Sequence, residues 1–255
     1  MCKIIAVVNQ KGGVGKTAVT CNLSYELAVL GKKTLIVDIE PSANSTLPYC
    51  EIFEHSIIDV LMNKTFDPHQ AIYQAKVNEK PIDNLYIMPS DIALAVAQNH
   101  IINKPHKEKI LIRQLERLQN EFDYIVIDCQ PTLSELNLLA IFAANFIIIP
   151  VRYEKNALKG LNDLFNTINE VKEDQVYDFK ILRNGLNATK KTIISTVQAS
   201  IEPLIQRGKV FETILRQDED INLATADDMP VSLYSSKSRG SSDYQQLTKE
   251  LLNAT

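Results

Sequence analysis

Short hydrophobic runs alternate with longer stretches of mixed polarity along most of the chain. The runs are five or six residues long and predict β-strands at 3–8, 34–38, 84–89, 124–128, 146–151 and 179–184. Most of them are continuously apolar, which is typical of parallel strands whose sheet is covered on both faces. The stretches between them predict helices near 17–30, 90–101, 107–120, 134–144, 156–172, 190–206 and 241–253.

Repeated strand–helix–strand units predict an α/β fold with a doubly wound, mostly parallel sheet, which binds ligands at the carboxyl ends of its strands. The length of 255 residues suits one domain of ordinary size. No internal repeat, low-complexity tract or long linker divides the sequence, so we expect a single domain over residues 1–255. Gly31 follows the first predicted helix, where a left-handed cap is favoured.

Composition and charge narrow the class of protein. Hydrophobic residues make up 45% and charged residues 23%, a globular composition. The 27 Lys and Arg against 31 Asp and Glu give a net charge of −4, which excludes a generally basic nucleic-acid binder but not a local basic patch. The scattered cysteines (Cys2, Cys21, Cys50, Cys129) form no CxxC pair, so we expect buried free thiols. The sequence shows no signal core and no membrane-spanning apolar run, which predicts a cytoplasmic protein.

The stretch "GGVGKT" (12–17), between the first strand and the first helix, has the spacing of a P-loop if Lys11 replaces its usual first glycine. Glycines let successive backbone N–H groups face phosphates, and the helix N-terminus adds partial positive charge. Lys16 would reach the β- and γ-phosphates, and the Thr17 hydroxyl would ligate Mg²⁺. A glycine-rich turn without a ligand is the alternative, but this set of residues in strand–loop–helix order favours a fold of P-loop NTPase type. The predicted nucleotide contacts here are Lys11, Gly12, Gly13, Val14, Gly15, Lys16, Thr17 and Ala18.

Two further strands end in carboxylates. "YIVID" ends in Asp128, which fits a Walker B aspartate that holds Mg²⁺ through water, although an aspartate there could merely cap the next turn. In "VDIEPSANST" (37–46), Asp38 and Glu40 alternate in the strand register and should project to the same side. Such a pair beside a triphosphate could position and polarise the attacking water. A turn role before Pro41 is the alternative, which we accept for Asn44 but not for both acids.

The motif "KGGVGKT" resembles the deviant Walker A signature of the ParA/MinD group of P-loop ATPases. Blocks such as "FDYIVIDCQPTLSELNLLAI" and "IIIPVRYEKNALKGLNDLFNTI" are similar to the ParA (Soj-like) partition branch, and the resemblance runs from Lys3 to the last helix. It implies an ATPase that converts ATP to ADP and phosphate with Mg²⁺. It also implies that Lys11 crosses a dimer interface to the partner's nucleotide, so that ATP drives a homodimer. The catalytic residues would be Lys11, Lys16, Asp38 and Glu40.

The chain departs from the family pattern at the hydrolytic position, where the family usually has an aspartate and this chain has Glu40. Because small displacements matter at such a site, hydrolysis is expected to be slow or to need a partner's help. "RNGLN" (183–187) falls where the family places an adenine-recognising asparagine. We favour Asn184 over Asn187, and either could simply make an Asx turn.

The sequence gives two opposing indications about a DNA-binding surface. Relatives commonly carry basic residues near 214–222, where this chain has Asp218, Glu219 and Asp220. The segment 180–217 holds seven Lys or Arg against two Glu, a local excess of five positive charges. A solvated surface and a patch for phosphate backbones both remain possible interpretations. The DNA-contact candidates are Lys190, Lys191, Arg207 and Arg216.

The resemblance implies a plasmid or chromosome partition ATPase in the cytoplasm, associated with the nucleoid. ATP-bound homodimers would cover DNA without sequence preference, and a ParB-like partner would stimulate hydrolysis and release them. Positioning of a protein cargo is the main alternative, since its ATPase core would look the same. A MinD-like membrane ATPase is less favoured, because "SDYQQLTKELLNAT" is not a basic amphipathic anchor, and we expect no membrane partner. An iron–sulfur carrier would need a cysteine pair at the dimer axis, and no suitable pair is evident.

Overall fold

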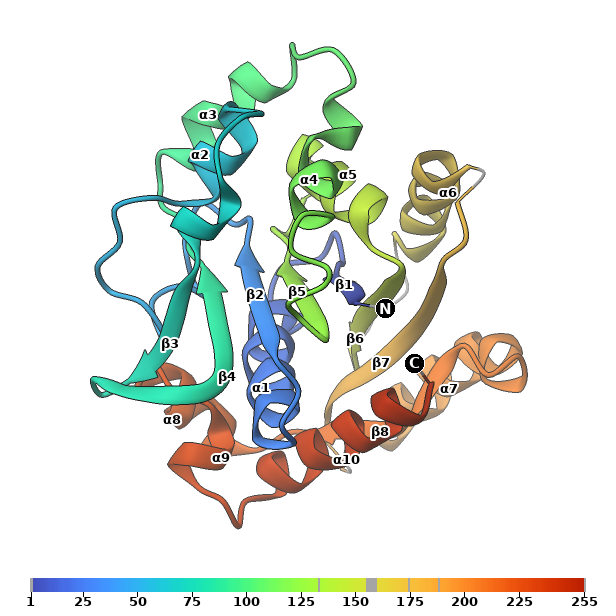
Figure 1. Cartoon of the computed structure of the whole chain (residues 1–255). Helices are drawn as coiled ribbons and strands as arrows, with labels where there is room; N and C mark the ends of the chain where they lie inside the picture. The colour runs from blue at the N-terminus through green and yellow to red at the C-terminus, as the bar shows by residue number, and fades with distance from the viewer. Residues whose placement is uncertain (1, 133, 155–159, 174, 188, 255) are drawn as a thin grey trace.

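The computed structural model describes residues 2–132, 134–154, 160–173, 175–187 and 189–254. An eight-stranded sheet runs through it in the order β3-β4-β2-β5-β1-β6-β7-β8 (Figure 1). The strands are β1 (Lys3–Val7), β2 (Thr34–Asp38), β3 (Tyr73–Val77), β4 (Lys80–Met88), β5 (Tyr124–Asp128), β6 (Phe146–Arg152), β7 (Asp178–Leu186) and β8 (Val210–Arg216). All neighbouring strands are parallel except β3 and β4, which are antiparallel. The predicted single α/β domain with a mostly parallel sheet is therefore confirmed.

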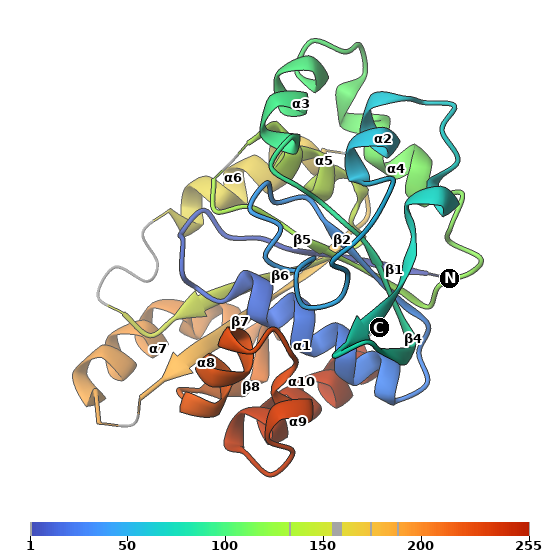
Figure 2. The ribbon, with the colours of Figure 1, turned by 90° about the vertical axis from the view of Figure 1, so that its left-hand side faces the viewer.

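Helices cover both faces of this sheet. They are α1 (Lys16–Val29), α2 (Ile57–Met62), α3 (Leu94–Ile101), α4 (Ile110–Leu115), α5 (Glu135–Ala143), α6 (Leu161–Lys172), α7 (Lys191–Gln206), α8 (Glu219–Ala226), α9 (Val231–Tyr234) and α10 (Arg239–Ala254), with 3-10 turns η1 (Pro68–Ala71) and η2 (Lys107–Lys109). Figure 2 shows α2 to α6 on one side of the sheet and α1, α8, α9 and α10 on the other. Buried residues of α7 join the core on the side of α5 and α6.

Strand β1 explains why the strand sequences are apolar without interruption. Ile4 and Ala6 pack into the core beneath α5, whereas Ile5 and Val7 pack into the core beneath α1 and α10. Successive side chains of a strand point to opposite faces, so a sheet covered on both sides needs an apolar residue at every position. All four of these side chains are buried.

Several elements differ from the sequence predictions. β2 and β5 have the predicted bounds, but β3, β8 and the first half of β4 were missed, as were α2, α8 and α9. β3 lies at the sheet edge with alternating exposure, so it lacks a continuous apolar run. α2 and α8 are too short for a periodic pattern and begin at side-chain caps, Ser56 and Asp218. The predicted helix 107–120 is a 3-10 turn followed by the short α4. The start of the predicted helix 156–172 falls on 156–159, outside the described residues.

Local features of the chain agree with the sequence reading. Gly31 has φ +77° and its N–H donates to the Ala28 carbonyl, as a left-handed C-terminal cap requires. The four cysteines are free, and Cys2, Cys21 and Cys129 are buried.

Within the described ranges, no helix combines the length and the apolar character that a membrane crossing needs.

Candidate nucleotide-binding site

Three strands bring the predicted site residues to one edge of the sheet. β5 lies between β2 and β1, and in this register Asp128 is paired with Asp38 on one side and with Val7 on the other. The loop that follows β1 therefore begins beside Asp128, and Asp38 lies one strand further along the same edge. This edge is formed by the carboxyl ends of parallel strands, where doubly wound sheets bind ligands.

The glycine-rich loop adopts a conformation that needs its glycines. Gly13 and Gly15 have φ of +71° and +93°. A Cβ on Gly15 would lie 2.3 Å from Nδ2 of Asn184, which donates to the Val14 carbonyl at 2.7 Å. Asn184 thus packs the end of β7 against the part of the loop that immediately precedes α1, which begins at Lys16. The backbone N–H groups of the loop and the N-terminus of α1 together form an anion-binding geometry.

Lys16 lies under this loop and is only 7% exposed. Its ammonium donates to the Lys11 carbonyl at 3.3 Å, so the charge stays inside the loop. Burial lowers the pKa of Lys16, and the nearby Asp128 opposes that effect. The side chain is placed to offer a cation to a phosphate in the loop.

The two strand-end aspartates are fully buried but differ in their partners. Asp38 accepts hydrogen bonds from the Glu40 N–H at 2.9 Å and from the Thr46 hydroxyl at 2.7 Å. Asp128 accepts one from the Thr20 hydroxyl at 3.3 Å, and its Oδ2 has no hydrogen-bond partner among the described residues. Burial raises the pKa of both carboxyls, and the charge of Asp38 further raises the pKa of Asp128. Asp128 therefore keeps one oxygen without a hydrogen-bond partner among the described residues, whereas both oxygens of Asp38 accept hydrogen bonds within the protein.

Glu40 is placed differently from the sequence expectation. β2 ends at Asp38, so Glu40 lies in the following turn and the strand register does not align the two acids. The turn is closed by the Ala43 N–H, which donates to the Glu40 carbonyl at 2.9 Å. The Glu40 carboxylate is half-buried, and the Asn44 amide donates to it over a long distance of 3.5 Å. Of the two acids, Glu40 is the one whose carboxylate is free to bind water.

Lys11 is held by residues that the sequence reading missed. Its ammonium lies 2.5 Å from Oε2 of Glu154, whose Oε1 lies 3.2 Å from Nε of Arg152. Arg152 in turn donates to the Gly13 carbonyl at 3.1 Å. Arg152 is the last residue of β6 and Glu154 lies two residues beyond it, and β6 pairs with β1, so both lie beside the loop. The only signal for them was their place in the block that resembles the ParA branch.

Asn187 makes an Asx turn, the alternative role that the sequence analysis left open for it. Its Oδ1 accepts from the Thr189 N–H at 3.1 Å in an Asx turn, and its amide donates to Gln217. Only Asn184, of this pair, contacts the phosphate loop.

The basic segment 180–217 is less free than its composition implies. Lys190, Lys191 and Arg207 are exposed at the two ends of α7. Arg216, in contrast, forms a two-pronged ion pair with Asp243, with Nη2 to Oδ1 at 2.6 Å and Nε to Oδ2 at 3.0 Å.

The other cations of this segment also have partners. Lys180 lies 3.7 Å from Glu250, Lys209 lies 2.5 Å from Asp178, and Arg183 donates to two backbone carbonyls of β8. Acidic Asp218 is the N-cap of α8 and also accepts from the Gly240 N–H at 2.7 Å. Its carboxylate therefore has a structural function that the family comparison could not reveal.

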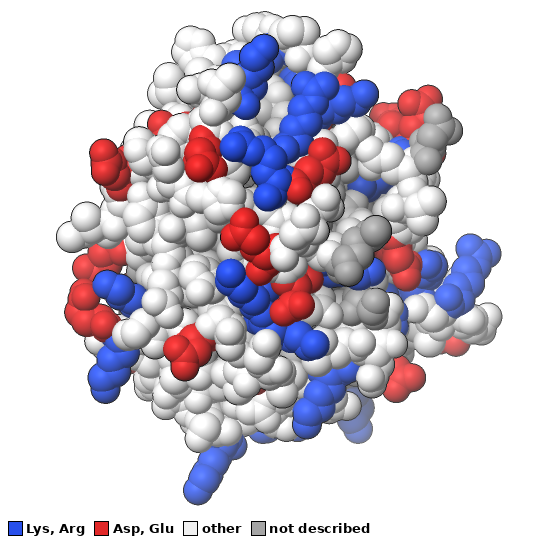
Figure 3. All heavy atoms as spheres, in the orientation of Figure 1, with Lys and Arg blue, Asp and Glu red and all other residues white. Residues whose placement is uncertain are grey.

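A second group of basic side chains, overlooked in the sequence, surrounds α4: Lys64, Lys104, Lys107, Lys109, Arg113 and Arg117. Figure 3 shows blue side chains gathered at the top of the molecule, over this region. Lys104 donates to the Leu61 and Met62 carbonyls, and Lys107 lies 2.9 Å from Glu135. Arg117 donates to the Phe66 carbonyl. Half of the group therefore already has a hydrogen-bond or ion-pair partner within the protein.

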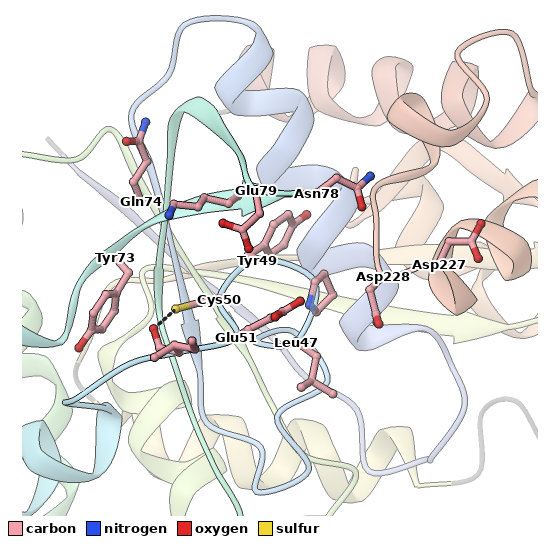
Figure 4. A pocket seen from close by; sticks show the side chains of 13 residues that line it. Leu47, Tyr49, Cys50, Glu51, Tyr73, Gln74, Asn78, Glu79, Asp227 and Asp228 are labelled. Atoms are coloured by element: carbon pink, nitrogen blue, oxygen red, sulfur yellow. Dashed lines mark hydrogen bonds between the residues drawn. The ribbon is translucent and has the colours of Figure 1, made fainter.

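A cavity of about 510 Å³ opens beside the site, between the loop 47–52, the β3–β4 hairpin and the α8–α9 connection. Figure 4 shows Glu51, Glu79 and Asp228 arranged around it, each from a different one of these segments. No residue of the phosphate loop lines this cavity. It is separate from the nucleotide site, although the loop that borders it continues from the Thr46 that holds Asp38.

The fold, the glycine loop, Lys16 and Asp128 together define a P-loop nucleotide-binding domain. Residues 2–181 match a family described as an AAA domain. The chain is 34% identical over 258 residues to the sporulation initiation inhibitor protein Soj of Bacillus subtilis (strain 168), covering 98% of each. It is 32% identical over 263 residues to the chromosome partitioning protein ParA of Myxococcus xanthus (strain DK1622), covering 98% of this chain and 88% of that one.

A solved structure is also similar. It is the septum site-determining protein MinD of Pyrococcus horikoshii OT3 complexed with Mg-ADP, with a TM-score of 0.78 and 25% identity over 98% of this chain and 96% of that one. The chain belongs to the ParA/Soj-like branch of the ParA/MinD family of P-loop ATPases.

Proposed function

We propose that this protein is an ATP- and Mg²⁺-dependent partition ATPase that forms a homodimer with ATP, binds DNA without sequence preference and is released after hydrolysis. The observation that carries the proposal is that the deviant loop, with Lys11 at its mouth, lies at the same sheet edge as an Asp128 oxygen that has no hydrogen-bond partner in the described part of the chain. Its full-length similarity to Soj and ParA proteins supports the partition role.

The residues present fit a Mg²⁺ ion. Asp128 offers a buried carboxylate oxygen with no other partner among the described residues, and Thr17 lies in the first turn of α1 beside the loop. No group of three or more His, Cys, Asp or Glu in the described chain could hold a metal by itself. That suits Mg²⁺, which is usually held by one or two carboxylates together with substrate phosphates. When bound, Mg²⁺ would offset the negative charge of the phosphates.

The chain's own residues have separable tasks. Lys16 and the loop N–H groups bind the phosphates, which need the charge and donors that the loop concentrates there. Glu40 orients the attacking water, while Asp38 fixes the turn through the Glu40 N–H and the Thr46 hydroxyl. Asp38 is then a positioning residue. Lys11 supplies a cation to the nucleotide of the second subunit, which makes dimerisation depend on the γ-phosphate.

DNA binding rests on the exposed cations of α7. Lys190 and Lys191 lie at its N-terminal end and Arg207 just after its C-terminal end, and all three are exposed. A dimer would present them twice, so ATP would strengthen binding by avidity. Contacts to phosphate release counterions, so the affinity should fall steeply with salt and show little sequence preference.

Positioning of a protein cargo is the second candidate. It is favoured by the partners that occupy four of the seven basic residues of the segment 180–217, namely Lys180, Arg183, Lys209 and Arg216. A MinD-like membrane anchor at the C-terminal end has less support, because the apolar residues of α10 (Tyr244, Leu247 and Leu251) are buried in the core.

The test has two arms. Light scattering should detect a dimer with Mg·ATP but not with Mg·ADP, and Lys11→Ala should abolish it while retaining some nucleotide binding. A mobility shift with non-specific duplex DNA should then require ATP and weaken with salt. A dimer that forms equally well in Lys11→Ala contradicts the role of Lys11. A wild-type dimer that binds no DNA at low salt contradicts the DNA-binding role and favours positioning of a protein cargo. Stimulation of hydrolysis by a ParB-like protein distinguishes these two cargoes further.

A further inference from the structure

Glu154 is the centre of a three-charge cluster at the mouth of the phosphate loop. Each of its oxygens faces a different cation, Oε2 to Lys11 at 2.5 Å and Oε1 to Arg152 at 3.2 Å. Lys11 is also fixed at its backbone, where its N–H donates to Asn9 at 2.9 Å. The lysine that the proposed function directs to the partner's nucleotide is therefore bound, in the single chain, to its own subunit.

The position of Glu154 is fixed by a frame that does not depend on Lys11. Arg152 ties it to the loop by donating to the Gly13 carbonyl at 3.1 Å. A Cβ on Gly185, which has φ +69°, would lie only 3.2 Å from Cγ of Arg152, so the neighbouring strand leaves room for the arginine. If Lys11 departs, Arg152 remains to hold the Glu154 carboxylate in place.

A polyphosphate and Glu154 compete for the same ammonium. Both are anions, so they repel each other when they approach Lys11 together. The contact between Lys11 and Glu154 also holds the pKa of Glu154 below its usual range, which keeps the carboxylate charged. Lys11 and Glu154 are 37% and 38% exposed, and an ion pair this open to water is weak enough to exchange.

We propose that Glu154 is a positioning residue that holds Lys11 on its own subunit until the nucleotide of a second subunit displaces it. Glu154 thereby sets the ATP-dependent threshold for dimerisation. This inference rests on the proposed function, because it takes the dimer and the role of Lys11 across its interface from there.

The expected size of the effect follows from the exposure of the pair. One exposed ion pair changes an equilibrium constant by about 1.4-fold to fivefold. A symmetric dimer exchanges two such pairs, so their removal should tighten dimerisation by about twofold to thirtyfold.

The test compares dimer dissociation constants in Mg·ATP, measured by analytical ultracentrifugation. Glu154→Gln should dimerise more tightly than the wild type by about twofold to thirtyfold. It should also weaken more steeply with salt, because Lys11 then meets the phosphates as a free cation. Glu154→Asp, which keeps a carboxylate, should fall between the two. Glu116→Gln removes one exposed acid at the C-terminal end of α4 and controls for net charge.

A double variant separates this role from a merely structural one. Because Lys11→Ala should not dimerise with Mg·ATP, adding Glu154→Gln to it should restore no dimer, since no lysine remains to be released. A dimer restored by Glu154→Gln in the Lys11→Ala background, or a Glu154→Gln dimer as weak as or weaker than the wild type, overturns the inference alone. A wild type that forms no dimer with Mg·ATP overturns the proposed dimer function first, and the inference with it.

Discussion

The nucleotide site and the basic segment 180–217 were both predicted from the sequence, yet only the residues of the nucleotide site converge in the structure. The glycine loop, Lys16 and Asp128 come together at one sheet edge, where Oδ2 of Asp128 has no hydrogen-bond partner among the residues that the structure describes. The basic segment disperses its charge. Arg216 is bound to Asp243, and Lys180 and Lys209 lie near acids from other elements.

The contrast shows which sequence features predict a functional site correctly. A P-loop motif specifies a local backbone conformation, and the strand order then brings residues such as Asp128 beside it. A count of charges prescribes nothing local, since the acids that neutralise Arg216 and Lys180 come from α10, 27 and 70 residues further along the chain. A binding motif is thus more reliable when the backbone, rather than the composition, defines it.

Lys16→Ala should give the largest effect and tests the buried side of the comparison. It removes the ammonium beneath the loop, so Mg·ATP affinity should fall at least about a hundredfold, the scale of a lost charge-assisted contact to phosphate. Isothermal titration calorimetry measures it. Lys191→Ala, an exposed cation of the basic segment, is the matched control and should bind Mg·ATP like the wild type. Equal losses in the two variants would erase the distinction between the regions.

Glu40→Ala comes next and tests whether a single acid of the turn orients the water. Turnover should fall by about a hundredfold or more, the usual contribution of a positioned acid–base group. The ATP-bound dimer should persist, because the phosphate contacts remain. Phosphate release and light scattering report the two quantities separately.

Glu40→Asp is the companion variant and should preserve or raise turnover. Wild-type turnover in Glu40→Ala would move the role to Asp38 or to another residue.

The two buried aspartates of the nucleotide site also predict that the free energy of unfolding depends on pH. Burial raises the pKa of Asp38 and Asp128, so between about pH 5 and pH 8 the folded protein binds more protons than the unfolded chain. Without nucleotide and metal, the free energy of unfolding should therefore fall as the pH rises through this range. Asp128→Asn should remove more than about 1 kcal/mol of that fall. Urea denaturation in chelator at several pH values tests it, and parallel curves for both proteins would contradict it.

The smallest effects concern single cations of the basic segment. Lys190→Ala and Lys191→Ala should each weaken DNA binding across all sequences and lower the salt slope by about one, as for one phosphate contact. Arg216→Ala should instead lower the free energy of unfolding by about 1–3 kcal/mol, because Asp243 is largely buried and loses its charged partner. Mobility shifts and thermal melts distinguish the two outcomes. A stable Arg216→Ala protein with lost DNA binding would restore Arg216 as a DNA contact.

Much of the fold and part of the site could be predicted. The apolar runs located β2 and β5 to the residue, because strands buried on both faces require that pattern. The edge strand β3 and the short helices α2 and α8 were missed, since their stability comes from packing and from caps such as Ser56 rather than from a long periodic pattern. The similarity to Soj and ParA proteins confirmed the predicted family.

The sequence by itself determined the phosphate loop, Asp128 and the layered sheet, because glycine conformations and strand apolarity are rules of the local backbone. Only the tertiary structure decided which acid of the 38–40 pair is free, and which residues hold the two lysines of the loop. Thr20 reaches Asp128 across 108 residues and Glu154 reaches Lys11 across 143. Such contacts follow from strand order and side-chain packing, and the residues that make them carry no local signal of their partners.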